Sequence, residues 1–134
     1  METPALALLS VTPIYVGLLG LLWIPFTLRV GLYRVKTKIN LGDGDDPEML
    51  LRMRGHGNFI ESVPLALIML LVMELVGAGD TLLHILGALL VAGRLLHYVG
   101  ITELGPFACR PVGQVATLSV YLVSSLWLIY SALA

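Results

Sequence analysis

The sequence has little charge and only one cysteine. Asp, Glu, Lys and Arg make up 13% of its 134 residues, whereas a soluble domain carries about 25%. A single cysteine, Cys109, excludes an intrachain disulfide and a metal cluster held by cysteines. The three histidines (His56, His84 and His97) are widely scattered, so we predict no metal site. No basic segment precedes the first apolar run, so a cleaved signal peptide is not expected.

Apolar residues, by contrast, make up 57% of the chain, and the mean hydropathy is +0.91. They form four runs, which predict helices at about residues 5–35, 48–76, 81–101 and 110–133. A helix of about 20 apolar residues can cross the hydrocarbon core of a bilayer. We therefore expect an all-α membrane protein, a four-transmembrane-helix bundle in which residues 1–134 form a single domain.

The basic residues of the chain all fall near one end of the predicted bundle. They are Arg29, Arg34, Lys36, Lys38, Arg52, Arg54, Arg94 and Arg110. The opposite end, which holds the two termini and the turn at 77–80, has none. Basic residues are retained on the cytoplasmic side, so we expect the basic end to be cytoplasmic and both termini to face outward.

An acidic loop precedes the second predicted helix. Asp46-Pro47-Glu48 has the pattern of a helix start, with Asp as the N-cap and Pro in the first turn. The neighbouring acids lack the ligand spacing of an EF-hand calcium loop. We therefore interpret this segment as a helix cap.

Several polar residues lie where the second and third helices enter the apolar region. Arg54, Asn58 and Glu61 are spaced i, i+4 and i+7, so they share one face of a helix. Arg94 shares a face with His97 and Tyr98 in the same way. Polar groups are costly within a membrane and often mark a binding site. The alternative is that Arg54 and Arg94 form ion pairs between helices.

Two further residues each fit two roles by sequence alone. His56 lies off the face of Arg54 and Asn58, and it is either a hydrogen-bonded structural residue or a ligand. Arg110 precedes Pro111 at the start of the fourth helix. A helix N-terminus carries partial positive charge, so a cation there makes an anion site. Without a bound anion, Arg110 is only a topology signal.

Three motifs in this order resemble those of the MAPEG family, the membrane-associated proteins in eicosanoid and glutathione metabolism. The motifs are Arg54-x-His56-x-Asn58-x-x-Glu61-x-x-Pro64, Gly93-Arg94-Leu95-Leu96-His97-Tyr98 and Arg110-x-x-Gly113-x-x-x-Thr117. The segments 41–47 and 73–78 are similar to the small bacterial inner-membrane branch of this family. The resemblance covers nearly the whole chain.

The resemblance implies a homotrimer that binds glutathione at its cytoplasmic end, between neighbouring subunits. The positions that match glutathione contacts of the family, or lie in its motifs near the ligand, are Arg54, His56, Asn58, Glu61, Arg94, His97 and Tyr98. Arg110 matches the arginine that stabilises the glutathione thiolate. A helix-one arginine also contacts glutathione in the family, and either Arg29 or Arg34 could match it. Ser62 and Ile101 depart from the family, which often has tyrosine at these positions.

The function implied is an integral-membrane glutathione transferase, or a glutathione-dependent peroxidase, in a bacterial inner membrane. Glutathione would be the co-substrate, with no metal and no nucleic-acid partner. A lipophilic second substrate would enter from the lipid bilayer, through a groove between helices one and four. Two alternatives are a non-enzymatic lipid-binding scaffold of the same fold and a small transporter subunit. The transporter is disfavoured because helix four carries only hydroxyl groups and Gln114 near the middle of the membrane.

Overall fold

A computed structural model describes residues 9–134 of the chain. This part folds into four helices and contains no strand. The helices are α1 (Thr12–Thr37), α2 (Pro47–Leu75), α3 (Asp80–Ile101) and α4 (Cys109–Leu133). All four are long and apolar enough to cross a membrane. The prediction of an all-helical fold with four potential membrane spans is confirmed.

The predicted helix bounds lie within two residues of those in the structure, except at the start of α1. Helices α2, α3 and α4 each begin one residue before the predicted position. The first helix was expected from residue 5, but residues 9–11 precede it and Thr12 opens it, with Pro13 in its first turn. Residues 5–8 lie outside the described residues. Hydropathy alone cannot separate an apolar approach segment from the helix that follows it.

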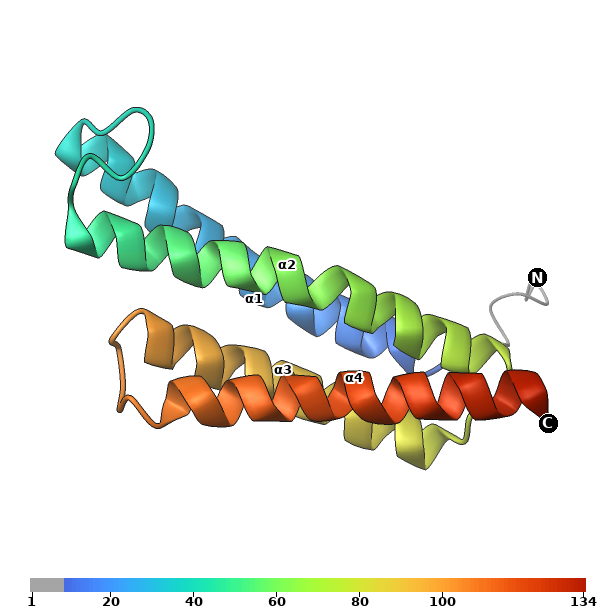
Figure 1. Cartoon of the computed structure of the whole chain (residues 1–134). Helices are drawn as coiled ribbons and strands as arrows, with labels where there is room; N and C mark the ends of the chain where they lie inside the picture. Colours follow the sequence, from blue (N-terminus) through green and yellow to red (C-terminus); the bar gives the residue numbers. More distant parts are fainter. Residues whose placement is uncertain (1–8) are drawn as a thin grey trace, which may run out of the picture.

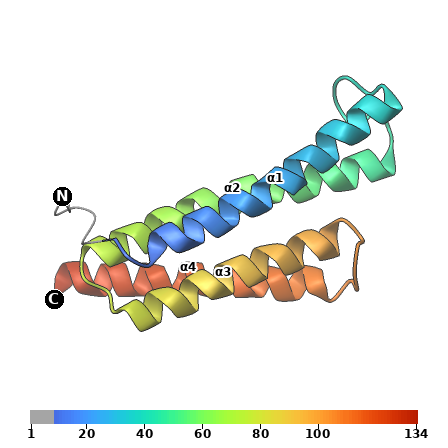
Figure 2. The ribbon, with the colours of Figure 1, turned by 180° about the vertical axis from the view of Figure 1, so that it is seen from behind.

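The helices run antiparallel to their chain neighbours and form two pairs, α1 with α2 and α3 with α4 (Figure 1). Figure 2 shows the same arrangement from behind, with α1 and α3 toward the viewer. The loop at 38–46 and the loop at 102–108 lie at one end of the bundle. The turn between α2 and α3 and the C-terminus lie at the other end. All eight basic side chains therefore belong to the half of the bundle that carries the two loops.

Glycines allow α3 and α4 to approach each other closely at this basic end. A Cβ atom on Gly113 would collide with the backbone of His97 and Gly93, and one on Gly100 would collide with the backbone of Arg110. A side chain at either position would push the helices apart. This close approach brings the first turn of α4, which carries Arg110, beside His97 of α3.

Much of the outer surface is apolar. On α4 the exposed large side chains include Val112, Val115, Leu118, Leu122, Leu126 and Ile129. Contiguous exposed apolar surface of this extent is rare on soluble monomers. Hydrocarbon chains or neighbouring protein would cover it, as expected for helices that span a membrane.

Candidate functional site

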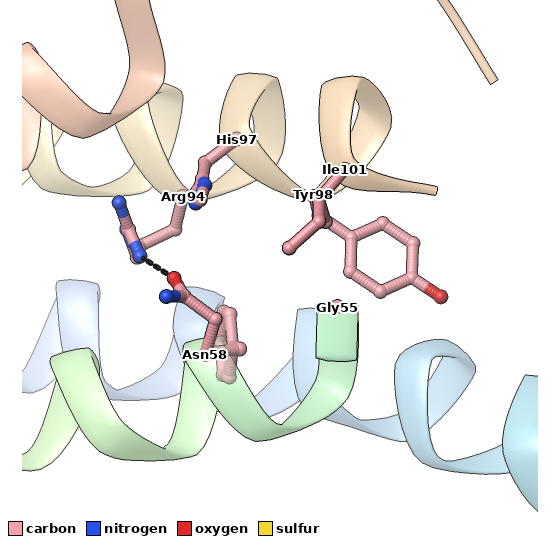
Figure 3. Close-up of a pocket in the computed structure, with 7 residues that line it drawn as sticks. Gly55, Asn58, Arg94, His97, Tyr98 and Ile101 are labelled. Atoms are coloured by element: carbon pink, nitrogen blue, oxygen red, sulfur yellow. Dashed lines mark hydrogen bonds between the residues drawn. The ribbon is translucent and has the colours of Figure 1, made fainter. Parts of the chain in front are cut away.

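Arg94 lies inside the bundle, 2% exposed, and donates to four neutral acceptors. Its Nε donates to Thr117 Oγ1 at 2.7 Å, and its Nη1 donates to Asn58 Oδ1 at 2.7 Å (Figure 3). Its Nη2 donates to the Gly113 carbonyl at 3.3 Å and to Gln114 Oε1 at 3.2 Å. The alternative of an interhelical ion pair does not describe Arg94, because none of these acceptors is a carboxylate.

His97 lies one turn along α3 from Arg94 and is 5% exposed. Neither of its ring nitrogens has a hydrogen-bond partner in the structure. A buried imidazole without a partner loses the hydrogen bonds that it makes in water. Such a group is an available donor or acceptor for a bound molecule.

An open cavity of about 330 Å³ lies beside His97. Its lining residues are Asn58, His97, Phe107, Arg110, Pro111 and Gln114. Arg110 is exposed in the first turn of α4, where the helix dipole adds to its positive charge. No carboxylate lines the cavity. The arrangement suits an anionic ligand.

Arg54 and Glu61 are both exposed on α2. Across residues 9–134, the one ion pair joins Arg52 to Glu48 at 2.7 Å, so neither Arg54 nor Glu61 is paired within the described chain. The structure brings Asn58 into the cavity but leaves these two charges at the surface. They are therefore free to meet a ligand or a neighbouring subunit.

The two helix-one arginines have different surroundings. Arg34 holds the loop after α1, where its Nη1 donates to the carbonyls of Ile39 and Gly42 at 3.2 and 2.9 Å. Arg29 donates to the Tyr98 hydroxyl at 3.3 Å and lies over the Tyr98 ring at 5.6 Å. Of the two, Arg29 contacts a residue of the predicted site.

His56 and Tyr98 are engaged within the bundle. The Nε2 atom of His56 lies 2.9 Å from Thr27 Oγ1, and its ring lies near Trp23. Tyr98 is buried and stacks on Phe26 at a centroid distance of 3.5 Å. These contacts favour the structural interpretation of His56 and place Tyr98 in the packing beneath Arg29.

Comparison with known proteins identifies the family of this chain. The family model described as MAPEG family matches residues 12–130. The chain belongs to the MAPEG family. It is 36% identical over 120 residues to the inner membrane protein YecN of Escherichia coli strain K12. The aligned region covers 87% of this chain and 91% of the relative. The YecN protein of Escherichia coli O6:H1 matches to the same extent.

Gln114 is a lining residue that the sequence analysis did not assign to the site. It follows Arg110 by four residues and therefore lies on the same face of α4. That spacing was the available signal. Thr117 belonged to the MAPEG motif, and the structure adds its hydrogen bond to Arg94.

Two apolar cavities of this MAPEG chain lie between α1 and α2. One, of about 300 Å³, is lined by residues that include Gly20, Trp23 and Phe59. The next, of about 430 Å³, shares Val16 and Leu67 with it. Within one chain α1 packs mainly on α2 and α3, so the groove between helices one and four stays a prediction.

Proposed function

We propose that this protein is an integral-membrane glutathione transferase that uses Arg110 to stabilise the glutathione thiolate. The observation that carries the proposal is the cavity in which Arg110 meets Asn58, His97 and Gln114 with no carboxylate in the lining. Membership of the MAPEG family and the glutathione chemistry implied by its motifs support this assignment.

The chemistry requires a populated thiolate. A free thiol has a pKa of about 8.5, and neighbouring cations lower it. A decrease of two pH units corresponds to about 2.7 kcal/mol of preferential stabilisation of the thiolate. Arg110 and the first turn of α4 supply positive potential of this kind. The thiolate sulfur then attacks an electrophilic carbon and forms a thioether, while the leaving group departs with its electron pair.

Peroxidase activity would use the same thiolate on a different substrate. Two glutathione molecules would reduce a lipid hydroperoxide to the alcohol and water, and they would leave as the disulfide. Both the transferase and the peroxidase reaction therefore require Arg110 to stabilise the thiolate. Assays with an aryl halide and with a lipid hydroperoxide distinguish the two activities.

The location and assembly of the site form part of the proposal. We place the protein in a bacterial inner membrane, as the name of the YecN relatives indicates for them, with the Arg110 cavity on the cytoplasmic side. We further propose a homotrimer in which a neighbouring subunit lies against the exposed Arg54 and Glu61. Native mass spectrometry from detergent should give the mass of three chains, and a monomer would contradict the shared site.

The decisive experiment on Arg110 measures the thiolate directly. Glutathione added to the wild-type protein in detergent should produce thiolate absorbance at about 240 nm. Arg110→Ala should abolish that absorbance, because the cavity loses its exposed cation. Lys36→Ala removes an exposed cation outside the cavity and should retain the absorbance. Equal absorbance in Arg110→Ala and wild type would refute the role of Arg110.

The apolar cavities between α1 and α2 support a second candidate, a lipid-binding scaffold without catalytic activity. Glutathione binding separates the two functions. A ligand at 100 times its Kd stabilises a protein by about 2.7 kcal/mol, which a thermal-shift measurement in detergent detects. No stabilisation by saturating glutathione would favour the scaffold.

A further inference from the structure

Two amide side chains connect the buried Arg94 to the cavity beside Arg110. Asn58 and Gln114 accept hydrogen bonds from Arg94 through Oδ1 and Oε1. Both also line the cavity, whereas Arg94 does not. Arg94 is therefore placed to affect the cavity only through its neighbours.

The chemistry of arginine determines how these amides are turned. A guanidinium group has five N–H donors and no acceptor, so it must face the oxygen of a neighbouring amide rather than the NH2 group. The NH2 group of the amide is then left for another partner. Figure 3 shows Asn58 in this orientation, with its oxygen on the dashed bond to Arg94 and its nitrogen away from that bond.

The same constraint acts on residues of two of the helices that line the cavity. Asn58 belongs to α2 and Gln114 to α4. Without Arg94 each amide could rotate by half a turn and present an acceptor instead of a donor. With Arg94 in place, both oxygens are occupied, so the NH2 groups are the donors left for a ligand in the cavity that Arg110 and the unpartnered ring of His97 also line.

We propose that Arg94 is a positioning residue that fixes the amides of Asn58 and Gln114 with their NH2 groups toward the Arg110 cavity and so makes the cavity selective for an anionic group. This proposal deepens the proposed function and rests on it for the identity of the ligand. The anionic group is a carboxylate or the thiolate of glutathione. Arg94 itself touches no ligand.

The cost of burying Arg94 agrees with this role. The guanidinium of Arg94 is 2% exposed and has only neutral acceptors. Its desolvation therefore costs more free energy than the packing of three helices requires. An apolar side chain would pack the same space at less cost. A functional requirement for the orientation of the two amides would explain why a buried arginine is present.

The sequence offers a direct probe of Gln114, which is the only glutamine in the chain. Protein labelled with 15N-glutamine in detergent has one side-chain NH2 group in its NMR spectrum. Titration with glutathione should shift that resonance in wild type. In Arg94→Lys, where one ammonium cannot hold both amides, the shift should fall to a small fraction of the wild-type value. An equal shift in the two proteins would overturn the role of Arg94.

A second variant tests the proposal without disturbing Arg94. Gln114→Glu keeps an oxygen for Arg94 and strengthens that bond, but it replaces the NH2 donor with a second acceptor. We expect KM for glutathione to rise by about tenfold or more, since a charge-assisted hydrogen bond is lost and repulsion is gained, while the thermal stability is retained. A KM equal to that of wild type would overturn the proposal.

Three probes separate failure of this inference from failure of the proposed function. A shift of the Gln114 resonance by glutathione but not by S-methylglutathione identifies the thiolate as the anion, and a shift by both identifies a carboxylate. A shift by inorganic sulfate but not by glutathione rejects the glutathione function and supports the donor-lined cavity. A shift by none of the three overturns the anion-selective cavity itself.

Discussion

Glu74 is the clearest case of a single residue with an effect beyond its own helix. It lies in the last turn of α2, is 8% exposed, and accepts hydrogen bonds from three backbone N–H groups at the start of α1. The donors are Ser10, Val11 and Thr12, at 2.6, 2.7 and 2.7 Å. No side chain of α1 caps its own N-terminus, so Glu74 supplies the cap and the negative charge that a helix start favours.

Replacement of Glu74 should therefore destabilise the protein at the end opposite the Arg110 cavity. Glu74→Ala leaves three N–H groups without an acceptor, at a cost of about 2–3 kcal/mol. We expect a lower Tm in detergent, measured by loss of helical circular dichroism. Glutathione binding by the protein that remains folded should be unchanged.

Asp80 provides the matched control for Glu74. It is an exposed acid in the first turn of α3 at the same end of the bundle, and it forms no side-chain cap. Asp80→Ala should change Tm much less than Glu74→Ala. Equal losses of Tm would mean that the cap on α1 contributes no special stability.

The start of α2 shows how one element is determined by its own sequence. Asp46 was expected to cap this helix, and its Oδ1 accepts from the N–H groups of Glu48 and Met49 at 2.9 and 3.1 Å. Its Oδ2 accepts from the Tyr33 hydroxyl at 3.0 Å. The backbone hydrogen bond from Met49 is the largest of the effects that lower the pKa of Asp46 below its ordinary value of 3.8. The cap thus favours the ionised carboxylate.

The lowered pKa of Asp46 predicts that the folded protein loses stability at low pH. A carboxyl group with a lower pKa in the folded state stabilises the fold fully above its unfolded pKa, and this stabilisation is lost as the pH falls through the folded pKa. Tm should therefore decrease when the pH is lowered below about 4. Part of that decrease should come from Asp46. Asp46→Asn caps a helix without titrating. If this variant has the same pH profile of Tm as wild type, Asp46 does not contribute to the loss of stability at low pH.

At the scale of the whole molecule, the gathering of all the basic residues in one half of the bundle predicts a topology. Helix α4 begins at Cys109, beside Arg110, at the basic end of the bundle. This half-buried residue is the only cysteine of the chain. A membrane-impermeant maleimide should therefore label Cys109 in inverted inner-membrane vesicles and leave it unlabelled in spheroplasts.

A relocated cysteine provides the control for this topology. Gly79 is exposed in the turn at the opposite end of the bundle. The double variant Cys109→Ser, Gly79→Cys should show the reverse labelling pattern, with modification in spheroplasts. Labelling of Cys109 from the outer side would place the Arg110 cavity outside the cytoplasm.

The helices follow from the sequence, because helix formation and membrane spanning depend on local composition and on caps such as Asp46. It also predicted the concentration of cations at one end and drew attention to Asn58, Arg94, His97 and Arg110. These residues could be found because their polarity conflicts with the apolar segments around them.

The different roles of those residues depend on the tertiary structure. Contacts between helices, which no local pattern encodes, buried Arg94 among neutral acceptors and left Arg110 at the cavity. The same is true of Glu74, whose backbone partners lie 62 to 64 residues away in the sequence. Such pairings arise only when packing brings distant segments together, because a buried donor or acceptor must then find a partner.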